Sequence, residues 1–246
     1  MSLESKTVMV VGASRGLGRG IAEAFADAGA RVVAVARDAA RLEELARHPS
    51  IRPQVADATD AAAAAALVAR YRPDVLALVA GATPPLAPLH ELSWAEFSVN
   101  WETDVRIAFV WLRLALRTPL APGSRVIVQS SGAAIAGSPL SGGYAGAKAT
   151  QRLMAEYADD EAKRAGLGID VVAVLPRLTG VTDLGRPAVA AYAARNGVSV
   201  EQYQRRMGTP VTPATAGAAY VDLATRDAAD LAPAYSLTGD GLQPLR

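Results

Sequence analysis

The chain has 246 residues, of which 51% are hydrophobic and 20% are charged, and its formal net charge at pH 7 is +1. This length allows a sizeable α/β core, and a near-neutral charge without basic runs argues against a nucleic-acid surface. The absence of cysteine excludes disulfides and thiolate catalysis, and with two histidines, His48 and His90, a zinc site or a Ser-His-Asp triad is not expected.

The N-terminal segment does not have the pattern of a signal peptide. Its apolar run, Thr7–Val11, is short and is followed directly by glycines. No stretch of the sequence approaches the roughly 18 uninterrupted apolar residues that a membrane-spanning helix needs. We therefore expect a cytoplasmic protein with no membrane partner.

Short β-branched runs alternate along the chain with longer segments of helical periodicity. The predicted strands are Thr7–Val11, Arg31–Val35, Ile51–Ala56, Asp74–Val79, Ser124–Gln129, Ile169–Leu175 and Ala234–Leu237. The predicted helices lie at about 16–28, 38–47, 60–70, 94–118, 143–165 and 213–225. The nearly apolar early strands and the short connections predict an α/β fold, a doubly wound parallel sheet in one domain that spans residues 1–246.

Two segments have properties beyond this alternation. The helix around 103–117 is apolar on most sides, so we expect it to be buried by its own fold or by a partner subunit. Residues 183–212 interrupt the alternation after the sixth strand. They are expected to form a lid over the carboxyl ends of the strands.

A glycine-rich turn follows the first predicted strand. Its residues, in a G-x3-G-x-G spacing, are Gly12, Ala13, Ser14, Arg15, Gly16, Leu17 and Gly18. Glycines at such a turn let the backbone approach a pyrophosphate, and the helix that follows points its N-terminus at the same group. The sequence therefore predicts dinucleotide binding here.

The end of the second strand bears on the choice of dinucleotide. A carboxylate at that point would bind a ribose 2′-hydroxyl and repel a 2′-phosphate. The sequence instead places Arg37 there, after the small Ala36, and Arg15 lies in the glycine turn. Two guanidinium groups that converge on one point suit a phosphate dianion, so NADP(H) is predicted over NAD(H). Asp57 and Ala58, after the third strand, are placed to contact the adenine.

Tyr144 and Lys148 are four residues apart in a predicted helix and therefore share one face of it. Of the 25 basic residues, three are lysines, at positions 6, 148 and 163. A tyrosine titrates at about pH 10, too high for an efficient acid or base at neutrality, and a nearby ammonium charge lowers that value. The pair predicts an acid–base unit; the alternative is two residues of a helix surface.

Together these motifs resemble the short-chain dehydrogenase/reductase family in its single-domain form, from Gly12 to the stretch at 238–241. The resemblance implies a Rossmann fold with a seven-stranded parallel sheet, a nicotinamide cofactor and often a homotetramer. It implies that the tyrosine transfers the substrate proton and that the lysine holds the nicotinamide ribose and acidifies the tyrosine. A serine 13 residues before the tyrosine would polarise the carbonyl, which indicates Ser131, with Ser130 as the adjacent alternative.

The sequence departs from the family pattern in three places. After the fourth strand it reads Leu78-Val79-Ala80-Gly81 where the family has Asn-Asn-Ala-Gly, so the small residues remain beside the cofactor and the polar ones do not. The fourth catalytic position, usually an asparagine, aligns with Asp104, and Asn100 is a nearby alternative. The family residue commonly holds, through its main-chain carbonyl, a water that leads to the lysine. Asp104 can supply that carbonyl or be a structural substitute.

The third departure is Pro176-Arg177, where the family has Pro-Gly. Pro176, Thr179 and Thr182 are the candidates for contacts to the nicotinamide amide or the pyrophosphate. Arg177 can bind an anionic group of the substrate, extend into solvent, or pair with a carboxylate of the lid.

The predicted function is NADPH-dependent reduction of a ketone, or the reverse oxidation of a secondary alcohol. The pocket would lie between residues 83–89, residues 138–141 and the lid, and its apolar walls favour a hydrophobic or cyclic small molecule, such as a polyketide of secondary metabolism. An imine would be served by nearly the same geometry. The arginines of the lid, at 186, 195, 205 and 206, can bind a phosphate of an acyl carrier or of coenzyme A, or they can form a solvated face.

Two other functions are consistent with the fold. The altered residues at 78, 79, 104 and 177 are compatible with a cofactor-binding protein without net redox chemistry, such as a lyase, isomerase or sensor. A Rossmann methyltransferase is disfavoured by the two arginines placed for a 2′-phosphate. No metal site is predicted in any of these cases, and a homo-oligomer, a dimer or a tetramer, is expected from the resemblance.

Overall fold

Eight strands form one sheet in the computed structural model, which describes residues 3–118 and 120–245. The strands are β1 (Thr7–Val11), β2 (Arg31–Ala36), β3 (Ile51–Val55), β4 (Val75–Leu78), β5 (Arg125–Gln129), β6 (Asp170–Pro176), β7 (Ala234–Thr238) and β8 (Gly241–Leu245). Their order is β3-β2-β1-β4-β5-β6-β7-β8, and the first seven are parallel. The predicted doubly wound α/β sheet is therefore confirmed.

The predicted number of strands, seven, was one too few. β8 pairs antiparallel with β7 at the edge of the sheet, with Thr238 opposite Gly241. Gly241 has φ 111°, a left-handed conformation that favours glycine, and it lets the chain reverse directly after β7. The strand also contains Pro244, which an edge strand tolerates. The alternation of strands with helices does not predict this hairpin, because β8 follows β7 without a helix between them.

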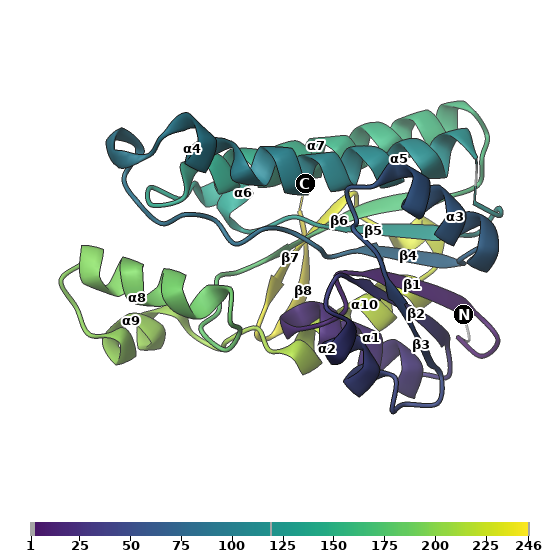
Figure 1. Cartoon of the computed structure of the whole chain (residues 1–246), viewed down its shortest axis with the longest axis horizontal. Helices are drawn as coiled ribbons and strands as arrows, with labels where there is room; N and C mark the ends of the chain where they lie inside the picture. Colours follow the sequence, from purple (N-terminus) through teal and green to yellow (C-terminus); the bar gives the residue numbers. More distant parts are fainter. Residues whose placement is uncertain (1–2, 119, 246) are drawn as a thin grey trace.

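Helices cover both faces of the sheet, in the arrangement shown in Figure 1. They are α1 (Gly16–Asp27), α2 (Ala39–Leu45), α3 (Ala61–Tyr71), α4 (Trp94–Asn100), α5 (Arg106–Arg117), α6 (Ala133–Ala136), α7 (Gly142–Arg164), α8 (Gly185–Arg195), α9 (Val200–Met207) and α10 (Pro213–Thr225). Short 3₁₀ turns lie at Leu89–Glu91 and Ala228–Asp230. Within the described residues, no helix has the length and hydropathy to cross a membrane.

The sheet is buried on both faces, as its apolar strands predict. On β1, Val8 and Val10 belong to the core under α1, α2 and α10, whereas Met9 and Val11 belong to the core under α3, α5 and α7. Figure 1 shows these two groups of helices on opposite sides of the sheet. The layers leave the carboxyl ends of the strands open at one edge.

The helix predicted over 94–118 contains a wide turn. α4 ends at Asn100, a π-helical turn occupies Trp101–Val105, and α5 begins at Arg106. Such turns often lie at functional sites. α5 is buried on one side, through Trp111 among others, whereas Phe109 on the same helix is 56% exposed. Its own fold therefore covers part of the apolar surface that the sequence predicted to be buried.

Candidate active site

A cleft of about 880 Å³ lies at the carboxyl ends of β1, β2, β4, β5 and β6. Every residue that the sequence predicted for catalysis or for cofactor contact lines it. These residues are Gly12, Ser14, Arg15, Gly16, Leu17, Gly18, Arg37, Asp57, Ala58, Ala80, Gly81, Asp104, Ser131, Tyr144, Lys148, Pro176, Thr179 and Thr182. Motifs spread over most of the chain thus meet in one place, because parallel strands bring their carboxyl ends to the same edge of a sheet.

The glycine turn at one end of the cleft has the geometry that a pyrophosphate requires. Gly12 has φ 100°, and a Cβ there would lie 2.5 Å from the backbone nitrogen of Ala80. A Cβ on Gly18 would lie 2.1 Å from the carbonyl oxygen of Gly12. α1 begins at Gly16, and no side chain caps its first turn. The amide groups of that turn therefore remain available to an anion in the cleft.

Arg15 and Arg37 lie beside this turn, and both side chains are exposed. Neither forms an ion pair among the described residues. Asp57, on the same side of the cleft, accepts hydrogen bonds from the backbone and hydroxyl of Thr59, both at 2.8 Å. These hydrogen bonds lower the pKa of Asp57, with a smaller contribution from the charge of Arg37. This end of the cleft therefore presents two guanidinium groups, unpaired within the described residues, beside the ionised carboxylate of Asp57. Asp38 and Arg41 also line it and form an ion pair with each other.

The two candidate serines at the end of β5 have different surroundings. Ser130 is buried, and its hydroxyl donates a hydrogen bond of 2.7 Å to the carbonyl of Lys148 on α7. The hydroxyl of Ser131 is half-buried and accepts a hydrogen bond of 3.2 Å from Ala133. Its donor is therefore available to a molecule in the cleft. This geometry favours Ser131 for the contact to a carbonyl, as the spacing predicts.

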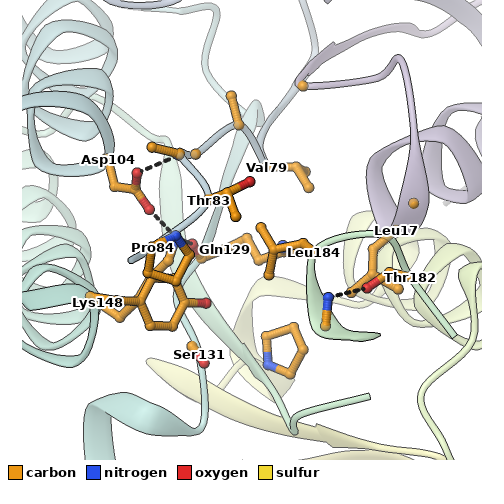
Figure 2. Close-up of a pocket in the computed structure, with 18 of the residues that line it drawn as sticks. Leu17, Val79, Thr83, Pro84, Asp104, Gln129, Ser131, Lys148, Thr182 and Leu184 are labelled. Atoms are coloured by element: carbon orange, nitrogen blue, oxygen red, sulfur yellow. Dashed lines mark hydrogen bonds and ion pairs between the residues drawn. The ribbon is translucent and has the colours of Figure 1, made fainter. Parts of the chain in front are cut away.

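Lys148 is held among three protein oxygens. Its ammonium nitrogen lies 2.8 Å from Oε1 of Gln151, 3.0 Å from Oδ2 of Asp104 and 3.4 Å from the carbonyl of Gln129. Figure 2 shows Asp104 and Lys148 facing each other from different helices. The same nitrogen lies 5.4 Å from the centre of the Tyr144 ring, within the range of a cation–π contact. The ammonium charge thus lies against the predicted acid.

Burial opposes the charge on Lys148, whose exposure is 4%. The negative charge of Asp104, the electrostatic interaction with Tyr144 and the hydrogen bond to Asp104 together outweigh that burial and raise the pKa of Lys148 above the ordinary value for lysine. Asp104 itself is fully buried, at 0% exposure. The lysine is consequently a stable cation, and its charge is partly offset by a carboxylate in direct contact.

Asp104 also holds the loop that follows β4. Its Oδ1 accepts hydrogen bonds from the backbone of Ala82 at 2.8 Å and from Asn100 at 3.3 Å. The Asn100 amide in turn donates to the carbonyl of Ala82 at 2.9 Å. Between the two candidates for the fourth catalytic position, Asp104 is thus the one that contacts Lys148. Asn100 holds the carboxylate of Asp104 and the loop after β4 in place through these hydrogen bonds.

One buried contact beside Lys148 is not predicted by the sequence. The main-chain carbonyl of Asp104, where the resemblance implied a water, accepts a hydrogen bond of 2.8 Å from Nε2 of Gln151. Gln151 is buried and lies three residues after Lys148 on α7. The signal in the sequence was a polar residue on the same helix face as Tyr144 and Lys148. Its partner on the wide turn before α5 could be recognised only from the packing of the two helices.

Residues after β6 form the other end of the cleft. Thr182 is buried, and its hydroxyl accepts a hydrogen bond of 3.1 Å from Gly185 at the start of α8, which Figure 2 shows. Thr179 is buried beside it. Arg177 is exposed, and within residues 3–118 and 120–245 it forms no ion pair with a carboxylate of the lid. Solvent and an anionic group of a substrate remain as partners for it.

The lid predicted at 183–212 consists of α8 and α9 with their connections, and Figure 1 shows it projecting beside the sheet. Tyr192 of α8 connects it to the loop before α7. Its hydroxyl lies 2.5 Å from Oγ of Ser138 and accepts a hydrogen bond of 3.1 Å from the backbone of Leu140. Its ring stacks on Tyr203 of α9, with centres 6.4 Å apart. Both tyrosines line the cleft.

Comparisons with known proteins show which family the chain resembles. The model of the short chain dehydrogenase family matches residues 6–193. A short chain dehydrogenase/reductase of Aspergillus aculeatus is 34% identical over 170 residues, which are 65% of this chain and 60% of the relative. L-xylulose reductase from Homo sapiens is 33% identical over 132 residues, 52% of this chain and 54% of the relative. The chain thus spans little more than half the length of these relatives.

Two further matches cover more of their proteins. An uncharacterized oxidoreductase of Mycobacterium tuberculosis is 32% identical over 187 residues, which are 71% of this chain and 68% of the relative. The crystal structure of a 3-ketoacyl-(acyl-carrier-protein) reductase from Brucella melitensis, complexed with NADH, superposes with a TM-score of 0.79. The match covers 97% of this chain and 98% of the reductase chain at 23% sequence identity. It therefore shows that the two proteins share a fold.

Proposed function

Because the chain belongs to the short-chain dehydrogenase family, we propose that the protein is a nicotinamide-dependent oxidoreductase that interconverts a ketone and a secondary alcohol. The observation that carries the proposal is the convergence of Ser131, Tyr144 and Lys148 in one cleft, with the buried ammonium group against the tyrosine ring. Relatives named D-erythrulose reductase and L-xylulose reductase support a reaction at a carbonyl group.

We propose NADP(H) as the cofactor. The open amides of the α1 N-terminus fit the pyrophosphate, and Arg15 and Arg37 fit a 2′-phosphate because neither forms an ion pair among the described residues. Asp57 lies where an adenine would be contacted, and Thr179 and Thr182 lie at the nicotinamide end. When bound, the nicotinamide donates or accepts the hydride.

The residues of the chain supply the proton and the polarisation. Ser131 donates a hydrogen bond to the carbonyl oxygen of the ketone, which favours the negative charge that develops there. Tyr144 donates its phenolic proton to that oxygen as general acid, or accepts it from the alcohol in the reverse direction. Lys148 stabilises the resulting phenolate through its charge. The fold holds all three side chains at the edge of one sheet.

The walls around this point are mostly apolar. They include Ala82, Pro84, Leu86, Ala136, Leu184 and Ala188. Such walls favour a hydrophobic or cyclic ketone, with the hydroxyl groups of the loop before α7 as polar contacts. Arg177, exposed at the rim, would favour a substrate with an anionic group.

The proposal is tested by a panel of ketones and imines with NADPH, whose consumption is followed by absorbance. For any ketone that is reduced, Tyr144→Phe should lower turnover by about 10²–10⁴-fold, the usual contribution of a general acid, and leave NADPH binding intact. Tyr157→Phe is the matched control, because Tyr157 lies on the same helix and is exposed. An unchanged rate in Tyr144→Phe would refute the assigned acid.

The cofactor proposal has a separate test. Arg37→Asp should weaken NADPH binding far more than NADH binding, because it replaces a phosphate ligand by a carboxylate that suits a 2′-hydroxyl. Arg47→Asp, at an exposed position outside the cleft, is the control for the change of charge. Equal losses for both cofactors would contradict the assignment of the 2′-phosphate.

We also propose that the protein acts in the cytoplasm as a homo-oligomer. Exposed apolar side chains on α5, α7 and the turn before α5 support the homo-oligomer: Phe109, Leu153, Tyr157 and Trp101. Apolar surface of this kind on adjacent helices is favourable to bury against a second copy. Sedimentation of the purified protein distinguishes a dimer or tetramer from a monomer.

A further inference from the structure

The amide of Gln151 lies between two groups of the proposed active site. Its nitrogen donates to the main-chain carbonyl of Asp104, and its oxygen accepts from the ammonium group of Lys148, both at 2.8 Å. Gln151 is 1% exposed. The side chain thus fills the space between that carbonyl and the lysine and satisfies both of them.

A buried glutamine needs such partners. Placing an amide in the interior costs free energy unless its hydrogen bonds are made, and the other buried residues of this face of α7, apart from Lys148, are alanines. An apolar side chain would satisfy packing alone. The amide nitrogen of Gln151 instead contacts the main chain of Asp104, and its oxygen contacts Lys148, which lies against the Tyr144 ring. These contacts explain why a glutamine is buried here.

The ammonium group of Lys148 has three donors, and three protein oxygens surround it. Gln151 of α7 and Asp104 of the wide turn before α5 provide the two shorter contacts, at 2.8 and 3.0 Å. The carbonyl of Gln129 provides the third, at 3.4 Å. The longest contact is therefore the one that a cofactor hydroxyl can replace at least cost.

We propose that Gln151 is a positioning residue, whose amide bridges the Asp104 carbonyl to Lys148 in the place of a water molecule. It fixes the ammonium group against the Tyr144 ring through protein contacts alone. An amide does not pass a proton along as water does, because its N–H bonds stay intact. The proton that Tyr144 donates must then be restored from the open side of the cleft. This consequence rests on the proposed function; the bridge itself does not.

Lysine NMR tests the bridge without a substrate. The chain has three lysines, at positions 6, 148 and 163, so their side-chain ammonium signals can be assigned by Lys6→Arg and Lys163→Arg. The side chains of Lys6 and Lys163 are 41% and 69% exposed and serve as internal references. We expect the ammonium protons of Lys148 to exchange with water much more slowly than those of the other two.

Gln151→Ala removes the amide and leaves room for water, so the exchange at Lys148 should accelerate by about tenfold or more, the equivalent of one hydrogen bond to a charged group. Thr150→Ala is the matched control, because Thr150 is the adjacent residue and its hydroxyl donates to the carbonyl of Gly146 on the same helix. The exchange rate of the Lys148 ammonium protons should be unchanged in Thr150→Ala. Unaltered exchange in Gln151→Ala would overturn the proposal.

Gln151→Glu is the second variant and keeps an acceptor for Lys148 while losing the donor to Asp104. It should retain the protected Lys148 signal, and loss of that signal would also contradict the bridge. If the ketone panel yields a substrate, Gln151→Ala should lower kcat, leave KM for the ketone unchanged and alter the solvent isotope effect. A wild-type protein without any reductase activity would refute the proposed function and leave the NMR result standing.

Discussion

Replacing Asp104 by Asn removes the negative charge that lies 3.0 Å from the ammonium group of Lys148. The two side chains have nearly the same size, and asparagine can still accept the hydrogen bond from Ala82 through its oxygen. The charge of Lys148 then acts on Tyr144 without the opposing carboxylate. The phenolate should form at lower pH in the variant, because an anion near it has been removed.

The structure sets the size of this effect. Asp104 lies 3.0 Å from the lysine nitrogen, which lies 5.4 Å from the centre of the Tyr144 ring. The carboxylate oxygen is therefore at most about 8.4 Å from that centre. At an effective dielectric constant of about 20 it opposes a negative charge at the ring by about 2 kcal/mol. This energy corresponds to a factor of about 30 in a rate that depends on the phenolate. Both charged side chains are buried, so salt screens the effect little.

The assay is the near-ultraviolet absorbance of tyrosinate as a function of pH. Tyr144→Phe, made in the wild-type and in the Asp104→Asn background, isolates the signal of Tyr144 from those of the other tyrosines. The tyrosinate absorbance of Tyr144 should appear at lower pH in Asp104→Asn than in the wild type. The pH profile of alcohol oxidation, which requires the phenolate as base, should shift in the same direction.

Glu102→Gln removes a negative charge from the same wide turn at an exposed position and is the matched control. Its midpoint should move much less, because water screens an exposed charge. A midpoint of Asp104→Asn that stays in place or rises would refute the reasoning. It would mean that the carboxylate and the lysine do not act on the tyrosine as a charge pair.

Two other changes test the packing of the cleft and of the lid. Gly81→Ala would place a Cβ 2.6 Å from Oδ2 of Asp104. Urea unfolding should show a loss of stability of about 1–3 kcal/mol in this variant. Gly146→Ala is the control and should not lose stability, because a Cβ at that position meets no atom within 4 Å. Stability equal to wild type in Gly81→Ala would contradict the close approach. Tyr192→Phe removes the hydroxyl that joins the lid to the loop before α7 and should raise KM several-fold at an unchanged kcat. Tyr203→Phe is the control, because it keeps the stacked ring, and it should leave KM unchanged. If KM in Tyr192→Phe equals KM in Tyr203→Phe, the contact between the lid and the loop does not affect substrate binding.

The sequence predicted the sheet well because its signals are local. Buried parallel strands are apolar over a few residues, and the turn from Gly12 to Gly18 can be read without knowledge of the rest of the chain. The residues that gather in the cleft could also be predicted, because the carboxyl ends of parallel strands share one edge. Their individual roles stay predictions until the variants are measured.

The missed features depend on contacts between distant segments or on backbone details. The wide turn at Trp101–Val105 lies inside a segment whose periodicity reads as one helix. The bridge made by Gln151 exists because that turn packs against α7, and its direction cannot be read from spacing alone. β8 is a short edge strand that contains a proline, so its pattern is weak.

The charge pair also bears on the direction of the proposed reaction. A lysine without a carboxylate partner would favour the phenolate of Tyr144 and with it the oxidation of an alcohol. Asp104 offsets that charge at 3.0 Å, which favours the protonated phenol and its role as proton donor to a ketone. We therefore expect Asp104→Asn to lower the ratio of kcat for ketone reduction to kcat for alcohol oxidation at neutral pH. A ratio that stays constant would show that hydride transfer or product release, and not the tyrosine, limits both directions.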